Sequence, residues 1–322
     1  METLKETWSH KINTVTIGRT EKEGGTRSHS ITVGGERTLP FLFNEGDIPN
    51  APVIAMEITD VEPVDWPDSL KKPFGDALKD PVKWAQKCQD EYKVRLLCVK
   101  LMGTHPDFGN RSPEDSAKLV KEILKAVKLP LIVLGSGDDQ KDNAVLSKVS
   151  EATKGEGCLL GDATEKNYKT LTASCLADKH SIIAESPIDI NIAKQANILI
   201  SEMGFPMERI VINPTIGALG YGIEYAYSIM ERARNAALMG DKTLAMPFVC
   251  FVGQEAWRAK EAKSSSSEHP EWGDEDSRGI LWESSTAAAV LQSGGDILIM
   301  RHPRAIAETQ KYIDNLMKSG GK

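Results

Sequence analysis

The sequence predicts an α/β fold, a (β/α)₈ TIM barrel with an N-terminal β-hairpin extension. Eight short segments rich in β-branched residues recur along the chain, and each is followed by a stretch with amphipathic helical character. The segments are continuously apolar instead of alternating, as is typical of parallel strands buried on both faces. We expect the eight strands at 53–58, 96–102, 130–135, 157–161, 181–184, 209–213, 247–252 and 296–301.

The predicted helices carry recognisable start signals. Asp80 precedes Pro81 at one start, and Ser112 precedes Pro113 at another, so that a capping side chain and a first-turn proline stand together. Eight strand–helix units close into a barrel more readily than into an open sheet. A doubly wound sheet would need a glycine fingerprint after its first strand, where EITDVEP has no glycine. Further helices are expected at 138–153, 165–178, 189–203, 221–239, 283–293 and 303–318.

Two segments fall outside this repeat. Residues 12–43 contain the alternating runs INTVTIGR and SHSITVGG around the polar loop EKEGGTR, which predicts a hairpin covering the lower end of the barrel. Residues 258–279 form a polar insertion with four consecutive serines, too long for an ordinary loop between a strand and a helix. We therefore divide the chain into an extension over 1–50 and a barrel over 51–322 that carries this insertion.

Composition excludes several classes of function. The 322 residues carry a net charge of −7 with acids and bases interleaved, which argues against nucleic acid as a partner. No apolar run approaches the roughly 18 residues of a membrane helix, and the N-terminus lacks the apolar core of a signal peptide, so a cytoplasmic protein with no membrane association is expected. The five cysteines form no C-x-x-C pair, which indicates buried thiols instead of a disulfide framework, an iron–sulfur cluster or a zinc site.

The carboxyl ends of the strands define the mouth of such a barrel, where ligands and chemistry are found. These ends are mostly hydroxyls, amides and glycines, with no converging metal ligands and no paired nucleophile and base. Asp60 and Asp162 could equally cap the turns that follow their strands. Asp178-Lys179-His180 begins like the D-x-H-x-x-G signature of corrinoid domains, but Ile183 stands where the glycine should be. We therefore expect a mouth suited to binding, with no catalytic residue.

The segment VINPTIGALGYGI, residues 211–223, places three glycines between a strand and a long helix. Its spacing, G-x-x-G-x-G, matches neither the dinucleotide fingerprint nor the P-loop. We expect this loop on the mouth, where glycines let backbone amides approach a flat macrocycle or a phosphate.

Several stretches resemble the small subunit of the corrinoid iron-sulfur protein, which corresponds to the delta subunit of the CO dehydrogenase/acetyl-CoA synthase system. The resemblance covers almost the whole chain. Its most specific part is the INPTIGALGYGIEY loop within 184–241, and LPLIVLGSG, GCLLGDAT and the lead-in VTIG…SITVGG…LPFLF add to it.

The resemblance implies a heterodimer with a large subunit that carries the iron–sulfur cluster and much of the cobamide-binding surface. The pair would carry a methyl group from methyltetrahydrofolate, through a methyltransferase, to acetyl-CoA synthase in the anaerobic reductive acetyl-CoA pathway. This chain would then hold no cluster, would bind no metal through its own side chains and would share the cobamide with its partner. The expected cobamide-facing positions, each chosen by its place at a strand end, are Thr104, Ser136, Asp162, Ala163, Ser186, Asn213, Thr215, Gly220 and Arg301.

Two alternatives remain open at this stage. The chain could be the methyltetrahydrofolate:corrinoid methyltransferase, with Asp162 and Asn213 contacting the pterin, although strands ending in Ser-Gly and Glu-Ser-Pro offer fewer amide and acid groups than that site would need. It could also be a structural barrel that holds a partner and contacts no ligand.

Overall fold

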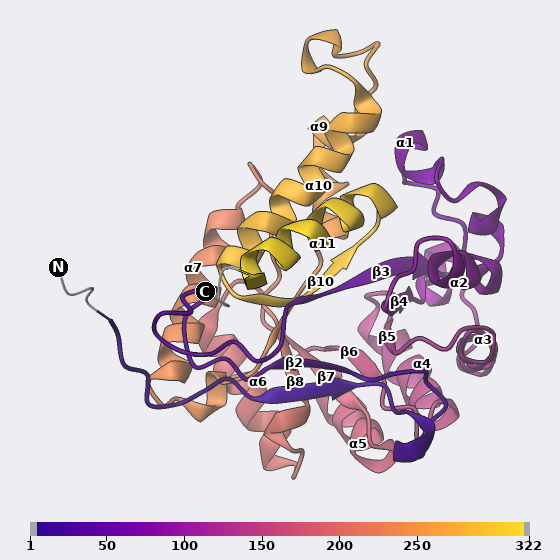
Figure 1. The fold of residues 1–322 in the computed structure, drawn as a ribbon. Coiled ribbons are helices and arrows are strands. Elements are labelled where there is room, and N and C mark those ends of the chain that lie inside the picture. The colour runs from indigo at the N-terminus through magenta and orange to yellow at the C-terminus, as the bar shows by residue number, and fades with distance from the viewer. Residues whose placement is uncertain (1–4, 319–322) are drawn as a thin grey trace.

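Eight parallel strands close into a barrel in a computed structural model that describes residues 5–318 (Figure 1). Around the barrel the order is β10-β3-β4-β5-β6-β7-β8-β9, so that neighbours in sequence are neighbours in space except where β10 joins β3. The predicted (β/α)₈ fold is therefore confirmed. The strands are β3 Val53–Thr59, β4 Leu96–Lys100, β5 Leu131–Leu134, β6 Leu159–Ala163, β7 Ser181–Glu185, β8 Ile210–Asn213, β9 Phe248–Cys250 and β10 Gly295–Met300.

Helices follow the strands and cover the outside of the barrel. Asp80 caps α2 by accepting from the amides of Val82 and Lys83, and Ser112 caps α3 by accepting from the amide of Asp115, as their sequence signals predicted. The longer helices are α2 Pro81–Asp90, α3 Pro113–Ala126, α4 Asp139–Ala152, α5 Tyr168–Asp178, α6 Ile190–Glu202, α7 Ile223–Leu238, α10 Glu275–Gln292 and α11 Pro303–Lys318.

Helix α10 differs from the sequence expectation, because it begins at Glu275 and not at residue 283. Its first turns lie inside the segment interpreted as a polar insertion. The Asp274 carboxylate accepts from the amide of Ser277 at 2.8 Å and caps the helix, while Gly279 lies against the Trp257 ring, where a side chain would not fit. The polar composition of 258–279 concealed these turns, whose helical geometry is fixed by capping and tertiary packing.

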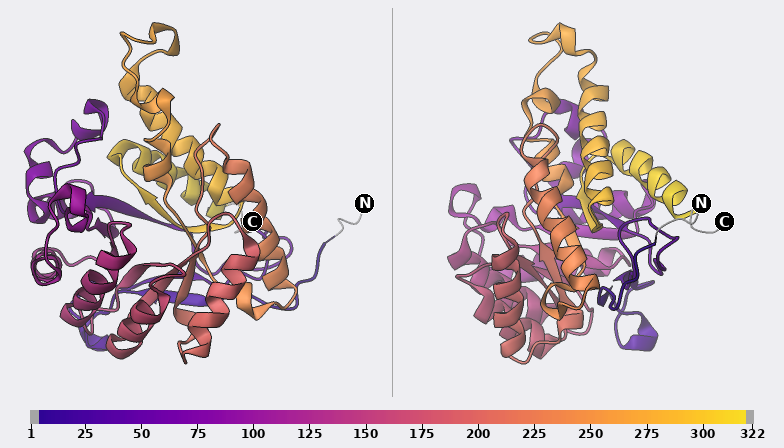
Figure 2. Two further views of the ribbon diagram at one scale, coloured as in Figure 1. Left: turned by 180° about the vertical axis from the view of Figure 1, so that it is seen from behind. Right: turned by 90° about the vertical axis from the view of Figure 1, so that its left-hand side faces the viewer.

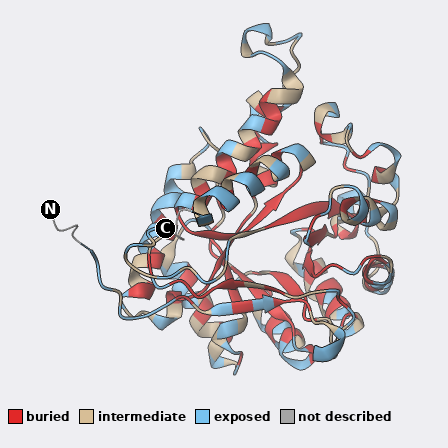
Figure 3. Ribbon diagram, viewed as in Figure 1, coloured by how far each residue is buried: buried red, intermediate tan, exposed pale blue. Residues whose placement is uncertain are grey.

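The hairpin strands β1 Thr14–Ile17 and β2 Ile31–Gly34 pair antiparallel, as the alternating pattern predicted. Val15, Ile17, Ile31 and Val33 are buried and share one apolar cluster with strand residues such as Leu96. Figure 3 shows this continuous buried zone through the barrel strands. Because the cluster joins hairpin and barrel side chains, the hairpin completes the barrel core instead of lying loosely on it.

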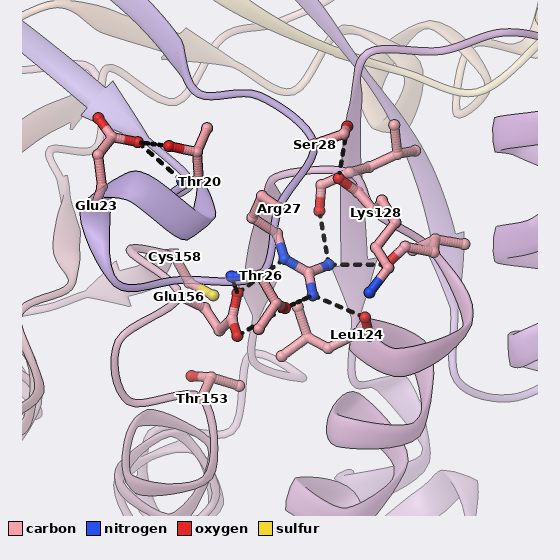
Figure 4. A network of polar contacts seen from close by, with 12 residues as sticks. Thr20, Glu23, Thr26, Arg27, Ser28, Leu124, Lys128, Thr153, Glu156 and Cys158 are labelled. Carbon is pink, nitrogen blue, oxygen red and sulfur yellow. Dashed lines mark hydrogen bonds and ion pairs between the residues drawn. The ribbon is translucent and has the colours of Figure 1, made fainter.

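Arg27 anchors the loop of the hairpin to the barrel (Figure 4). Its Nε donates to Glu156 at 2.8 Å, and its Nη atoms donate to the carbonyls of Leu124 at 2.8 Å, Val127 at 2.8 Å and Leu129 at 3.2 Å. The Arg27 guanidinium is buried. Water therefore cannot easily replace it as the donor to the three carbonyl groups.

Two segments project from the carboxyl ends of the strands (Figures 1 and 2). One follows β3 and contains the short helix α1 Asp68–Lys71; the other follows β9 and contains α8 Val252–Ala256 and α9 Lys260–Lys263. Arg278 ties the second segment together by donating to the carbonyls of Glu261, Ser264 and Gly273. The residues of the predicted insertion therefore form an ordered arm beside the mouth. Over residues 5–318, no helix has the length and hydropathy needed to cross a bilayer.

The hairpin core is tested by Ile17→Ala. Removing a buried Ile side chain leaves a cavity beneath the barrel, so we expect the free energy of unfolding to fall by about 2–4 kcal/mol. The control Thr16→Ala alters the exposed face of the same strand and should change it by less than about 0.5 kcal/mol. Urea unfolding followed by circular dichroism measures both, and equal effects would contradict a hairpin that completes the core.

The anchoring role of Arg27 is tested by Arg27→Met, which removes the guanidinium donor from three carbonyl groups and leaves Glu156 with hydrogen bonds from Thr26 alone. We expect a loss of about 3 kcal/mol in the free energy of unfolding. Lys79→Met is the control, because the Lys79–Asp76 ion pair is exposed and should contribute less than about 1 kcal/mol. If both variants unfold at the same urea concentration, the anchor does not contribute as described.

Candidate functional site

A ring of polar side chains closes the top of the apolar barrel interior. Successive strand residues face opposite sides, so a residue two positions after an interior residue also faces inward. Ala55, Cys98, Ile183, Val211 and Ile299 belong to the interior cluster that includes the hairpin. The residues two positions later are therefore brought together at the mouth, and they are Glu57, Lys100, Glu185, Asn213 and Arg301.

Glu57 and Arg301 form a buried ion pair in this ring. Arg301 donates from Nε and Nη2 to Glu57 Oε1, at 3.0 and 2.7 Å. The guanidinium also lies over the Trp66 ring, 4.9 Å from its centroid. The charge of Arg301 is thus balanced within the barrel and its orientation is fixed on two sides.

Lys100 divides the mouth into two cavities of about 400 Å³ each, because it lines both. Its Nζ donates to Oε1 of Gln254 at 2.6 Å, which holds the ammonium between them. We call the first cavity the acidic lobe; it lies at β5, β6 and β7 and is lined by residues that include Asp162, Glu185, Leu134, Phe251, Pro187 and Ile192. We call the second the aromatic lobe; its lining includes Trp66, Phe108, Val64, Met102, Arg258 and Arg301.

Asp162 is the titratable group most affected by its position in the acidic lobe. Burial raises the pKa of its carboxyl to about 7, and the neighbouring carboxyl of Glu185 adds to the rise. Lys100 and an Asn213 amide that donates to Oδ1 at 3.4 Å act in the opposite direction. Near neutral pH this side chain can therefore either donate or accept a hydrogen bond.

Glu185 faces the same lobe from the next strand. Burial, and then the charge of Asp139, raise the pKa of its carboxyl. Within residues 5–318 no side chain or amide donates a hydrogen bond to it. The Asp142 carboxylate nearby is already occupied, since it accepts from the amides of Ser136 at 2.8 Å and Gly137 at 2.9 Å. Of the acids that line the lobe within residues 5–318, Asp162, Glu185 and the exposed Glu165 keep free acceptor capacity.

The rim of the mouth exposes large apolar side chains. Val64 is 76% exposed, Phe108 46%, Ile188 45% and Ile192 43%, and they come from the segments after β3, β4 and β7. An apolar rim around a polar cavity is a feature of surfaces that a ligand or another protein covers.

The nine residues expected to face the cobamide lie in three kinds of surroundings in the structure. Asp162 lines the acidic lobe and Arg301 the aromatic lobe, while Asn213 supports Asp162 and Ser136 is held by Asp142. Three others are buried within the protein, where the Thr104 hydroxyl donates to the Leu101 carbonyl at 2.7 Å and the Ser186 hydroxyl to the Asn213 carbonyl at 3.3 Å. The buried three are Thr104, Ala163 and Ser186.

The remaining two, Thr215 and Gly220, lie in the glycine loop, which packs against α10 and not over the cavities. The amide of Leu219 donates to the Thr286 hydroxyl of α10 at 3.4 Å. A Cβ on Gly217 would lie 2.3 Å from the carbonyl oxygen of Tyr221. The glycines therefore make room for the loop's own backbone, and residues 214–222, all of which the structure describes, line neither lobe.

Glu57 and Lys100 were not chosen from the sequence because they lie inside the strands expected at 53–58 and 96–102, and Glu185, which directly follows the strand expected at 181–184, was passed over in favour of Ser186. A signal was present, since each is a charged residue in or directly after a short apolar run: VIAMEIT, LLCVK and SIIAE. A charge inside a buried parallel strand indicates an inward-facing site.

The described part of the chain brings together no group of three or more His, Cys, Asp or Glu side chains that could hold a metal ion. His302 stacks on Trp257, and its Nδ1 accepts from the amide of Arg304 at 3.1 Å. Burial lowers the pKa of His302 to about 4, so the ring is neutral near pH 7.

The raised pKa of Asp162 predicts a pH-dependent stability. The folded value is about 7 against an ordinary 3.8, so the native state retains a proton that the unfolded state has lost between these values. Relative to Asp162→Asn, the wild-type free energy of unfolding should fall as pH rises from about 4 to 7 and then level off. Urea titrations at several pH values measure this difference. Glu165→Gln, at an exposed neighbour, is the control, and a constant difference for Asp162→Asn would contradict the prediction.

Solved structures with the same fold include dihydropteroate synthases. The enzyme from Clostridium difficile has a TM-score of 0.56 and 12% identity, covering 83% of this chain and 97% of that one. The enzyme from Thermus thermophilus has a TM-score of 0.55 and 12% identity, and the match covers 87% of this chain and 100% of that enzyme's chain. At this identity the likeness concerns the barrel fold alone.

Sequence relatives are far more similar. Subunit delta 1 of the acetyl-CoA decarbonylase/synthase complex from Methanosarcina thermophila is 33% identical over 317 residues, covering 97% of this chain and 72% of the relative. The delta subunit of the acetyl-CoA decarbonylase/synthase complex from Methanothermobacter thermautotrophicus is 38% identical over 283 residues, covering 88% of this chain and 71% of the relative. The family model for the CO dehydrogenase/acetyl-CoA synthase delta subunit matches residues 14–309. With this match and these relatives, the chain belongs to the family of CO dehydrogenase/acetyl-CoA synthase delta subunits.

Proposed function

We propose that this chain is the small subunit of a corrinoid iron–sulfur methyl carrier. Its barrel mouth covers a cobamide that a larger, cluster-bearing subunit holds from the other side. The pair carries a methyl group from methyltetrahydrofolate, by way of a methyltransferase, to acetyl-CoA synthase in the reductive acetyl-CoA pathway. In this role the chain binds and shields, and it performs no bond-making step of its own.

The observation that carries the proposal is the apolar rim around the two polar lobes, in a chain of the delta-subunit family. Val64, Phe108, Ile188 and Ile192 expose apolar surface on three sides of the mouth. A large ligand with a partner subunit above it would remove this surface from water. The arm formed by 258–279 stands beside the mouth and offers a further contact for the partner.

The mouth residues fit the edge of a cobamide. The corrin ring bears carboxamide groups, which both donate and accept hydrogen bonds. Asp162 and Glu185 offer acceptors and Lys100 offers a donor, and neither lobe is lined by histidine or cysteine. A bound cobamide supplies the cobalt that accepts and releases the methyl group. The chain's own contribution is to orient the macrocycle and exclude water from one face.

The methyltransferase alternative receives less support from the site. Both ends of the Asn213 side-chain amide are already used, since Nδ2 donates to Asp162 at 3.4 Å and Oδ1 accepts from the amide of Thr215 at 3.0 Å. An asparagine so occupied is poorly placed to stabilise a changing charge on a pterin. A barrel without ligand contact, in turn, leaves two open lobes without a role.

The proposal predicts that the chain purified alone is colourless, and that co-expression with a larger iron–sulfur subunit yields a complex with one cobamide. Ile192→Glu places a charge on the rim and should lower cobamide retention in the complex at least tenfold. Leu176→Glu, a similarly exposed position on α5, is the matched control and should retain it. Visible absorbance during dialysis measures retention.

Two outcomes would contradict the carrier function. The first is stoichiometric retention of cobamide by the isolated chain. The second is formation of methylcobamide from methyltetrahydrofolate and free cobamide by the isolated chain, without any partner. The second result would favour the methyltransferase instead.

A further inference from the structure

We propose that Glu283 is a positioning residue that connects the base of the arm to Arg301 in the mouth, so that the position of the arm determines where the Arg301 guanidinium lies. The arm consists of residues 258–279, and Trp257 directly precedes it. The positioning of Arg301 stands on contacts within this chain. Its consequence for the bound cobamide rests on the carrier function proposed above.

Glu283 lies on α10 and is fully buried, and its carboxylate accepts hydrogen bonds from two directions. From the side of the arm, the indole Nε1 of Trp257 donates to Oε2 at 2.8 Å. From the side of the mouth, the backbone amide of Arg301 donates to Oε1 at 2.5 Å and that of His302 donates to Oε2 at 3.1 Å. One carboxylate therefore holds the base of the arm and the end of β10 together.

The three hydrogen bonds to Glu283 depend on one another. Burial raises the pKa of its carboxyl to about 7, while the donors from Arg301, Trp257 and His302 act in the opposite direction by favouring the carboxylate. A carboxylate can accept from all three N–H groups, whereas a protonated carboxyl would turn its own hydrogen toward one of them. Loss of any one donor therefore weakens the charged form that the other two donors require.

Close packing leaves little free space around this carboxylate. A Cβ on Gly253 of α8 would lie 2.7 Å from Cγ of Arg301 and 2.9 Å from Oε1 of Glu283. A Cβ on Gly279 would lie 2.4 Å from the ring of Trp257. Because densely packed interiors transmit displacements instead of absorbing them, a shift at the base of the arm is passed on to Arg301.

Arg301 carries this constraint into the mouth. Its guanidinium lines the aromatic lobe, donates to Glu57 at 3.0 and 2.7 Å and lies over the Trp66 ring. Trp66 belongs to the segment after β3, so the two projecting segments hold Arg301 between them, one by its backbone and the other by its side chain. A displaced backbone would lengthen or tilt the bonds to Glu57, which weakens them and frees the guanidinium to move.

Hydrogen exchange of the Arg301 Nε–H group, measured by NMR on the full chain without any ligand, tests the positioning role. Trp257→Phe removes the indole N–H that Glu283 accepts. We expect exchange about fivefold faster or more, as is typical of coupled sites. Trp282→Phe is the matched control on the same helix, because the Trp282 Nε1 has no hydrogen-bond partner within residues 5–318, and it should leave the rate unchanged.

Arg278→Met tests whether the arm itself acts through Glu283. Arg278 donates to three carbonyls of the arm and lines neither lobe. Glu283→Gln replaces one accepting oxygen with an amide that donates, so it breaks the link. We expect Arg278→Met to accelerate the exchange in the wild-type chain, and to add nothing to the effect of Glu283→Gln in the double variant.

The inference is overturned if Trp257→Phe leaves the exchange rate unchanged, if Trp282→Phe has an equal effect, or if Arg278→Met and Glu283→Gln are additive. Thermal unfolding of each variant, followed by circular dichroism, shows that the fold is kept. Should Glu283→Gln fail to fold, the comparison of Trp257→Phe with Trp282→Phe decides by itself.

The consequence for the ligand is measured in the complex with the larger subunit. Trp257→Phe should accelerate the loss of cobamide during dialysis about fivefold or more, and Trp282→Phe should not. Equal retention by Trp257→Phe and the wild type would overturn the link between arm and ligand. A wild-type complex that holds no cobamide would instead contradict the carrier function, and the exchange rates of the isolated chain would still decide the positioning role of Glu283.

Discussion

Closure of eight parallel strands is the constraint on which the rest of this molecule depends. A closed barrel sends every second strand residue into one confined interior, so the residues two places beyond an apolar layer must converge at its end. Cys98 and Ile183 belong to that apolar layer, and Lys100 and Glu185 follow them. The same alternation that fills the core therefore places charges of both signs at the mouth.

The two ends of the barrel differ in how completely their polar groups are paired. At the lower end the hairpin side chains enter the core, and Arg27 supplies donors to a buried set of carbonyls and to Glu156. At the mouth the ion pair of Glu57 and Arg301 is complete, whereas among residues 5–318 only Asn213 donates to Asp162 and no group donates to Glu185. Carboxyl groups with few protein partners in an open cavity are typical of sites where a ligand completes the network.

Local sequence signals predicted most of the fold. Continuous apolar runs located the eight strands within a few residues, and the caps at Asp80 and Ser112 gave helix starts because their hydrogen bonds are local. The start of helix α10 was missed although Asp274 caps it locally, because its first turns also contain Gly279, whose packing against Trp257 is a tertiary contact.

The site was less predictable than the fold. Reading only the strand ends selected Asp162 and Arg301, which line the two lobes, but it passed over Lys100 and Glu185, which line them as well. The same reading placed ligand contacts in the glycine loop, which instead packs against α10 through tertiary contacts remote in sequence. A charge within a buried strand was the more informative signal.

Hydrogen–deuterium exchange of this chain, alone and in complex with the larger subunit and cobamide, tests whether the barrel mouth is the surface that becomes covered. We expect slower exchange in the mouth segments, 60–66, 101–110 and 186–192, and little change in the hairpin over 12–34. Protection confined to the hairpin or to the outer helices, with the mouth segments exchanging as in the free chain, would contradict it.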